Sequence, residues 1–225
     1  MKTKLLLFTL FIFITEFAKA QNNISPLPSS IFIPGNGKQL IIFFSGDGGL
    51  NSFSTKLAKA INNLDYDVIL LDSKKYFNSK YSIDETTTII NRAIQTQFPK
   101  GIRISFLGYS FGADVVPFIF DNLNENTRKQ TTRLILLSPS ETTDLQVHWA
   151  DMMGLNVKRP FDVANKILRL SGVKILVIAD KEELPNTFKT IRKDLFSLAY
   201  LDGGHKFDEN QNQLLQLIHA FINKQ

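Results

Sequence analysis

The chain has 225 residues, 44% of them hydrophobic and 21% charged, so it is long enough to bury one sizeable core. Its net charge of +5 is not gathered into a basic run in the mature part, which argues against nucleic-acid binding. There is no cysteine, so disulfide bonds are excluded, and the three scattered histidines offer no metal-ligand spacing. We expect neither a metal nor another cofactor.

Residues 1–20 have the pattern of a secretory signal peptide. A lysine-bearing start precedes an apolar run over residues 5–14, and Ala18-Lys19-Ala20 fits a small-x-small cleavage site. The apolar run is shorter than a membrane span needs, although an uncleaved anchor is the alternative. We therefore expect an exported, periplasmic protein whose mature part is a single domain of residues 21–225.

Strand and helix patterns alternate along the mature chain. The strand-like runs are apolar on both faces, as in a mostly parallel sheet covered by helices on both faces, so the predicted fold class is α/β. Asn36-Gly37 favours a tight hairpin between the first two strands. Residues 138–162 interrupt the alternation and are expected to form a small cap. The expected strands lie at residues 30–33, 39–44, 67–71, 102–107, 133–137, 174–179 and 196–201, and helices begin at Ser52 or Ser54, at the capping box Ser82 to Glu85, after residue 110 and at residue 210.

The stretch around Ser110 organises the functional prediction. A short apolar run ends in Gly108-Tyr-Ser-Phe-Gly112, and a helix-like segment follows. A serine in such a G-x-S-x-G turn, between a strand and a helix, projects its hydroxyl above the sheet as a nucleophile. The alternative is a glycine-rich turn with an exposed serine, so catalytic partners elsewhere have to support the prediction.

A serine nucleophile needs a histidine base and an acid that orients it. His205 follows the last expected strand on a Gly-Gly loop, whereas His219 lies in the final helix, where a structural or solvent-facing role is expected. The order serine, acid, histidine is that of an α/β-hydrolase. Counting three residues past the small residue that ends the preceding strand selects Glu182 as the acid, with Asp180 as the second candidate.

The oxyanion hole is expected from backbone N–H groups beside Ser110. Phe111 would supply one, and the glycine-rich loop of residues 45–49 would supply another, from Gly46 or Asp47. A carboxylate beside a developing oxyanion is unfavourable unless it points away or meets a cation. Asp47 is therefore interpreted either as an acceptor that fixes the loop or as a contact for a cationic substrate group.

Several of these motifs together resemble the VirJ/AcvB bacterial virulence family. The resemblance covers nearly the whole mature chain, with Leu50 where the family tends to have tryptophan and an acid loop that is only loosely similar. The motifs are Phe43-Phe-Ser-Gly-Asp-Gly-Gly49, Asp72-Ser73 with Tyr76-Phe77, Gly108-Tyr-Ser-Phe-Gly-Ala-Asp-Val115 with Pro117-Phe118, Leu137-Ser-Pro-Ser140 with Thr143-Asp144, and Asp202-Gly-Gly-His205.

The resemblance implies an exported α/β-hydrolase fold of the short VirJ type. AcvB members are associated with hydrolysis of lysyl-phosphatidylglycerol at the outer face of the inner membrane, and VirJ members with type IV secretion. We therefore expect a serine esterase acting on aminoacyl esters of phospholipids, with Asp114, Asp144 and His148 as substrate contacts and a peripheral membrane association. The alternatives are a general carboxylesterase or lipase, and a binding or chaperone-like factor that contacts secretion-system proteins.

Overall fold

The computed structural model describes residues 25–78, 81–146, 160–190 and 196–224. The expected signal peptide lies outside these residues. Within them, the central feature is a seven-stranded sheet in the order β1-β3-β2-β4-β5-β8-β9. All neighbouring strands are parallel except the pair β1 and β3. The strands are β1 (Ser30–Ile33), β2 (Gln39–Phe44), β3 (Asp67–Leu71), β4 (Arg103–Tyr109), β5 (Thr131–Leu137), β8 (Lys174–Ala179) and β9 (Ser197–Tyr200).

The expected hairpin between the first two strands is wrong. β1 pairs with β3 instead, in antiparallel register from Ser30 opposite Leu71 to Ile33 opposite Val68. The intervening turn is held to the start of β3, because the Gly35 N–H donates to Asp67 and the Asn36 N–H donates to the Asp65 carbonyl. These distant contacts override the local preference of Asn-Gly for a hairpin.

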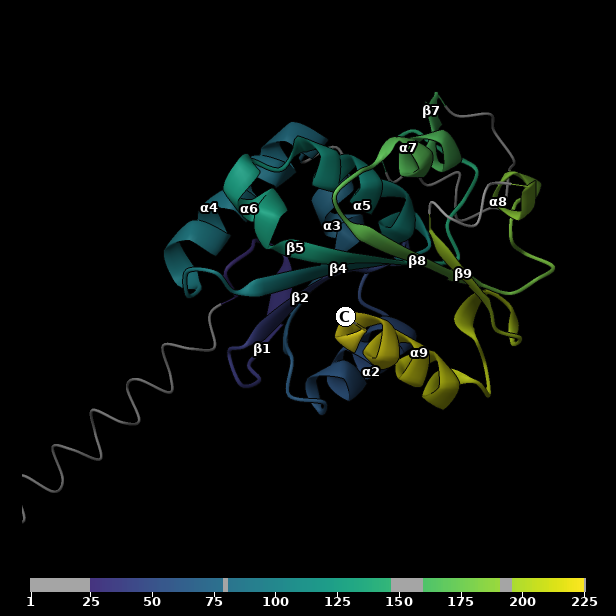
Figure 1. Cartoon of the computed structure of the whole chain (residues 1–225), viewed down its shortest axis with the longest axis horizontal. Helices are drawn as coiled ribbons and strands as arrows, with labels where there is room; N and C mark the ends of the chain where they lie inside the picture. Colours follow the sequence, from purple (N-terminus) through teal and green to yellow (C-terminus); the bar gives the residue numbers. More distant parts are fainter. Residues whose placement is uncertain (1–24, 79–80, 147–159, 191–195, 225) are drawn as a thin grey trace, which may run out of the picture.

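Helices cover both faces of the sheet (Figure 1). α2 and α9 lie on one face, and α3, α4, α5 and α7 lie on the other. The helices are α2 (Ser52–Asn62), α3 (Ser73–Phe77), α4 (Ile83–Gln97), α5 (Phe111–Asn122), α6 (Glu125–Gln130), α7 (Val163–Arg169), α8 (Asn186–Thr190) and α9 (Gln211–Asn223), and a 3₁₀ turn, η2, spans Gly204–Lys206.

Side-chain caps explain where two of these helices begin. The expected capping box at α4 is present: the Ser82 hydroxyl accepts from the Glu85 N–H at 3.2 Å, and Glu85 accepts from the Ser82 N–H at 2.8 Å. At α2 the cap is Asn51, one residue before Ser52 and three before Ser54, the two serines expected there. Asn51 accepts from the Ser54 N–H at 2.9 Å, and the Ser54 hydroxyl, at the third helical position, completes the box by accepting from the Asn51 N–H at 3.2 Å.

Two apolar clusters sandwich the sheet. One packs β-strand side chains such as Phe44 and Phe106 against α4, α5 and α7, and the other packs Ile41 and Phe43 against α2 and α9. Successive side chains of a strand point to opposite faces, so both faces of β2 are buried. This two-sided core fixes the sheet, and the parallel strands then bring their following loops to one edge.

The segment of residues 138–162 forms a separate two-stranded ribbon in its described parts. β6 (Thr142–Thr143) pairs antiparallel with β7 (Phe161–Asp162). The middle of the expected cap, residues 147–159, lies outside the described residues. Among the helices of the described ranges, none is both long and apolar enough to cross a membrane.

Candidate active site

Ser110 occupies a strained turn between β4 and α5. Its φ of 54° and ψ of −122° are unusual for a residue other than glycine. The glycines on either side are required sterically: a Cβ at Gly108 would lie 2.3 Å from the Gly112 carbonyl oxygen, and one at Gly112 would lie 2.2 Å from the Phe44 carbonyl oxygen. The Ser110 N–H donates to the Leu137 carbonyl of the neighbouring strand at 2.8 Å, which fixes the turn to the sheet.

His205 follows β9 and reaches Ser110. Its Nε2 lies 2.9 Å from the Ser110 Oγ, a hydrogen-bonding distance. The loop depends on Gly203, whose φ is 113° and whose Cβ, if present, would lie 2.4 Å from the Asp208 carbonyl oxygen. Phe207, fully buried against Phe53, anchors the far end of the turn. The sequence prediction that these two side chains meet agrees with this geometry.

The acid beside His205 is Glu183, not Glu182 or Asp180. Glu183 Oε2 lies 3.1 Å from His205 Nδ1. The chain makes a helical turn after β8, in which the Glu183 and Leu184 N–H groups both donate to the Asp180 carbonyl. Leu184 is buried and anchors this turn, and of the two exposed glutamates it is Glu183, not Glu182, that is hydrogen-bonded to the histidine. Counting from the end of the strand missed this turn by one residue.

Asp180 holds the acid loop and the histidine loop together. Its carboxylate accepts from the Glu182 N–H at 3.0 Å and from the Gly204 N–H at 2.8 Å. These backbone hydrogen bonds, the one from Glu182 first, lower the pKa of Asp180 below the usual value. Asp180 is thus a positioning residue that joins the two loops from which Glu183 and His205 project.

Two of the expected oxyanion donors, Phe111 and Gly46, lie beside Ser110. Gly46 is close enough that a Cβ there would be 3.4 Å from the Ser110 Cβ. The loop is held in place by bonds from the Ser45 N–H to the Leu71 carbonyl, and from the Ser73 N–H to the Ser45 hydroxyl. In the described chain, the N–H groups of Phe111, Gly46 and Asp47 donate to no protein acceptor. Those of Phe111 and Gly46 are therefore available to an oxygen bound next to Ser110.

Tyr109, the residue before the nucleophile, is mostly buried and has carboxylates nearby. Its ring centroid is 5.4 Å from that of His205. Burial, followed by the negative charges of Asp47, Glu183 and Asp208, raises the pKa of Tyr109 to about 12. Three carboxylates, Asp47, Glu183 and Asp208, thus lie close enough to Tyr109 to act on its hydroxyl.

Two of the three expected substrate contacts have described positions. Asp114 is only 2% exposed, and its carboxylate accepts from the Ser140 N–H at 2.7 Å. It therefore ties α5 to the loop after β5, and almost none of its surface is exposed to a substrate. Asp144 is half-buried, and it accepts from the Gln146 N–H at 3.1 Å. His148 lies outside the described residues.

His219 has the structural position expected for it. Its Nδ1 lies 2.9 Å from the Tyr66 hydroxyl, and Asn223 donates to the same hydroxyl. In the described ranges, no three histidine, aspartate or glutamate side chains are grouped closely enough to hold a metal ion.

The seven-stranded sheet, with its strained serine between β4 and α5 and its histidine after the last strand, is an α/β-hydrolase fold. A family model described as "Bacterial virulence protein (VirJ)" matches residues 38–225, so the chain belongs to the VirJ family. No curated protein sequence matches the chain.

Solved structures share the fold at low sequence identity. MenH from S. aureus has a TM-score of 0.63 at 14% identity, covering 87% of this chain and 98% of that one. A lipase-esterase related protein from Clostridium acetobutylicum ATCC 824 has a TM-score of 0.60 at 17% identity, covering 86% and 99%. A hydrolase from Pseudomonas aeruginosa PA01 has a TM-score of 0.62 at 14% identity, covering 87% and 94%.

Proposed function

We propose that this protein is a serine esterase in which Ser110 attacks an ester carbonyl carbon. The observation that carries the proposal is the continuous pair of contacts from Ser110 Oγ to His205 Nε2 and from His205 Nδ1 to Glu183. A serine hydroxyl is a weak nucleophile unless an adjacent base accepts its proton, and the base acts best when a third group holds its tautomer.

In the first half of the reaction, His205 Nε2 takes the proton from Ser110 Oγ as the oxygen bonds to the carbonyl carbon. The carbonyl oxygen becomes negatively charged and accepts hydrogen bonds from the Phe111 N–H and from the loop of residues 45–49. The protonated His205 then gives its proton to the alcohol oxygen, the carbon–oxygen bond breaks, and the acyl group stays on Ser110.

In the second half, water replaces the alcohol. His205 takes a proton from the water as its oxygen attacks the acyl carbon, and then returns a proton to Ser110 Oγ as the acid leaves. Glu183 accepts the Nδ1–H throughout. It keeps Nε2 as the basic nitrogen and stabilises the imidazolium while that nitrogen is protonated.

We further propose that the substrate is an aminoacyl ester of a phospholipid such as lysyl-phosphatidylglycerol, reached by the exported protein at the outer face of the inner membrane. Membership of the VirJ family and the resemblance to AcvB motifs support this substrate. The carboxylates of Asp47, Glu183 and Asp208 near Tyr109 also support it, because a cationic acyl group is attracted to a negatively charged site.

The test is to incubate residues 21–225 with lysyl-phosphatidylglycerol in mixed micelles and measure released lysine. N-acetylated lysyl-phosphatidylglycerol, with fewer positive charges, serves as the matched substrate. We expect faster release from the cationic lipid and no release by Ser110→Ala. Circular dichroism should show that the fold of this variant is unchanged. Normal turnover by Ser110→Ala would contradict the esterase proposal.

A general carboxylesterase is the second candidate, and the similarity to a lipase-esterase related protein favours it. A panel of neutral p-nitrophenyl esters separates the two, because preference for neutral esters would favour the second candidate. A binding factor for secretion-system proteins would leave Ser110 inert. Covalent labelling of Ser110 by a fluorophosphonate would therefore contradict a role in binding alone.

A further inference from the structure

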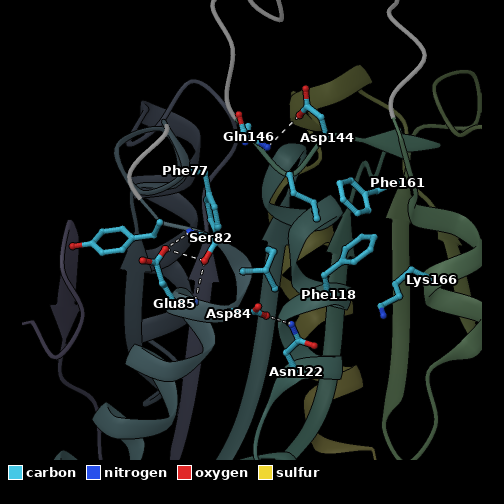
Figure 2. A pocket seen from close by; sticks show the side chains of 13 residues that line it. Phe77, Ser82, Asp84, Glu85, Phe118, Asn122, Asp144, Gln146, Phe161 and Lys166 are labelled. Carbon is cyan, nitrogen blue, oxygen red and sulfur yellow. Dashed lines mark hydrogen bonds between the residues drawn. The ribbon is translucent and has the colours of Figure 1, made fainter.

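A cavity of about 640 Å³ lies over α5, apart from the Ser110 hydroxyl. Figure 2 shows it from close by, with side chains of α4 on one side and those of β7 and α7 on the other. This volume is within the range of small-molecule sites. The lining residues used in the argument are Phe77, Ile83, Phe118, Leu145, Phe161 and Lys166.

The charged side chains of the cavity wall already have protein partners. Lys166 is paired with Asp121, which lies outside the wall. The acidic residues accept as follows: Asp84 from the Asn122 amide at 2.9 Å, Glu85 from the Ser82 N–H at 2.8 Å, and Asp144 from the Gln146 N–H at 3.1 Å. The donors to these three carboxylates are neutral, so the carboxylates stay charged, and the inference below rests on the apolar part of the wall.

The apolar part of the wall is exposed aromatic and aliphatic surface. Phe118 and Phe161 pack edge to face with their ring centroids 5.8 Å apart, and Figure 2 shows the two rings side by side in the cavity wall. Phe161 is 40% exposed, which is high for so large an apolar side chain. Ile83 and Leu145 are half-buried. Covering these groups with hydrocarbon would remove apolar surface from water.

One aromatic contact lies between the cavity wall and the residue that follows the catalytic serine. Phe77, in its wall, packs edge to face on Phe111 at 5.6 Å between ring centroids, and Phe111 directly follows Ser110. Phe118 lies seven residues further along α5, about 10 Å at the helical rise of about 1.5 Å per residue. An extended chain that advances about 1.25 Å per bond therefore needs roughly eight bonds to run alongside α5 from Phe111 to Phe118.

We propose that this cavity binds a hydrocarbon chain carried by the alcohol part of the ester substrate. The inference rests on the proposed esterase function and adds that the enzyme recognises its substrate as an amphiphile. The ester lies at Ser110, a polar spacer crosses Phe111, and the chain lies between α4 and α7 against Phe118 and Phe161.

The experiment uses lysine n-alkyl esters with alcohols of 2 to 14 carbons, each below its critical micelle concentration. We expect kcat/KM to be nearly constant up to about eight carbons and then to rise up to about fourfold for each methylene that enters the cavity. Phe161→Ala should lower the ratio of kcat/KM for the dodecyl ester to that for the ethyl ester about tenfold.

Ile31→Ala is the matched control, because Ile31 is 44% exposed and lies on β1 at the far edge of the sheet. It should leave the dodecyl-to-ethyl ratio unchanged. An unchanged ratio in Phe161→Ala, an equal fall in Ile31→Ala, or no dependence on chain length beyond eight carbons would overturn the cavity proposal while leaving the esterase intact.

Failure to hydrolyse any ester would instead overturn the proposed function. The cavity is then judged by calorimetric titration with dodecyl maltoside below its critical micelle concentration. Binding that weakens about tenfold in Phe161→Ala but not in Ile31→Ala would support a chain-binding cavity, and any other result would overturn it.

Discussion

Replacing Glu183 by glutamine removes the negative charge beside His205 and keeps the size of the side chain. The two groups are 3.1 Å apart, and their side chains are 40% and 47% exposed. At that separation, unit charges attract by roughly 1 kcal/mol in water and by roughly 5 kcal/mol at the effective dielectric constant of about 20 near a protein surface. Because each 1.4 kcal/mol changes a rate about tenfold, losing this attraction should slow the reaction by between about tenfold and several thousandfold.

For this half-exposed pair we expect an intermediate loss, with kcat of Glu183→Gln reduced about 10²- to 10³-fold. The assay is release of alcohol from a lysine alkyl ester, with Glu182→Gln as the control, because Glu182 is adjacent, exposed and not in contact with His205. Nearly normal activity of Glu183→Gln, or a comparable loss in Glu182→Gln, would refute the assignment of the acid to Glu183.

Three further outcomes follow from single contacts. The pKa of Asp180 is lowered in the folded protein, so the stabilisation from its hydrogen bonds is complete above the ordinary value of 3.8 and is lost as pH falls through the folded pKa. The melting temperature of the wild type should therefore fall more steeply at low pH than that of Asp180→Asn. Gly112→Ala should lower the free energy of unfolding by about 2–4 kcal/mol, because the added Cβ would meet the Phe44 carbonyl. The control Gly48→Ala should lower it by less than about 0.5 kcal/mol, because the atom nearest to its added Cβ would be 3.7 Å away. Urea denaturation measures both. Tyr76→Phe should raise the melting temperature by about 2–4 °C, because in the described residues the buried Tyr76 hydroxyl lacks a partner, while the exposed Tyr200→Phe should change it little. Equal effects within either matched pair would contradict these reasons.

The sequence predicted those parts of the fold whose signal is local and repeated. Apolar runs marked the strands of the sheet, the Ser82 capping box marked the start of α4, and the spacing of Gly108, Ser110 and Gly112 marked the strained turn. The serine and histidine were found because the loops after parallel strands meet at one edge of the sheet.

The errors occurred where long-range contacts or a single turn decided the outcome. β1 pairs with β3 because Asp65 and Asp67 hold the turn before β2, a contact that no local pattern reveals. The acid was misplaced by one residue because the turn after Ala179 is helical and is anchored by Leu184. Leu184 was a usable signal, since an apolar residue in a charged loop indicates which side faces inward.

The hydrogen bond from the Gly204 N–H to Asp180 joins the turn that carries Glu183 to the turn that carries His205, so the two turns should move together. Both turns are largely solvent-exposed, and the buried residues that anchor them include Leu184 and Phe207. Exposed segments with few buried contacts open at lower free energies than a core sheet. On warming, hydrolysis should therefore cease while the sheet is still intact, with both turns released together, and cooling should restore it without refolding of the whole chain.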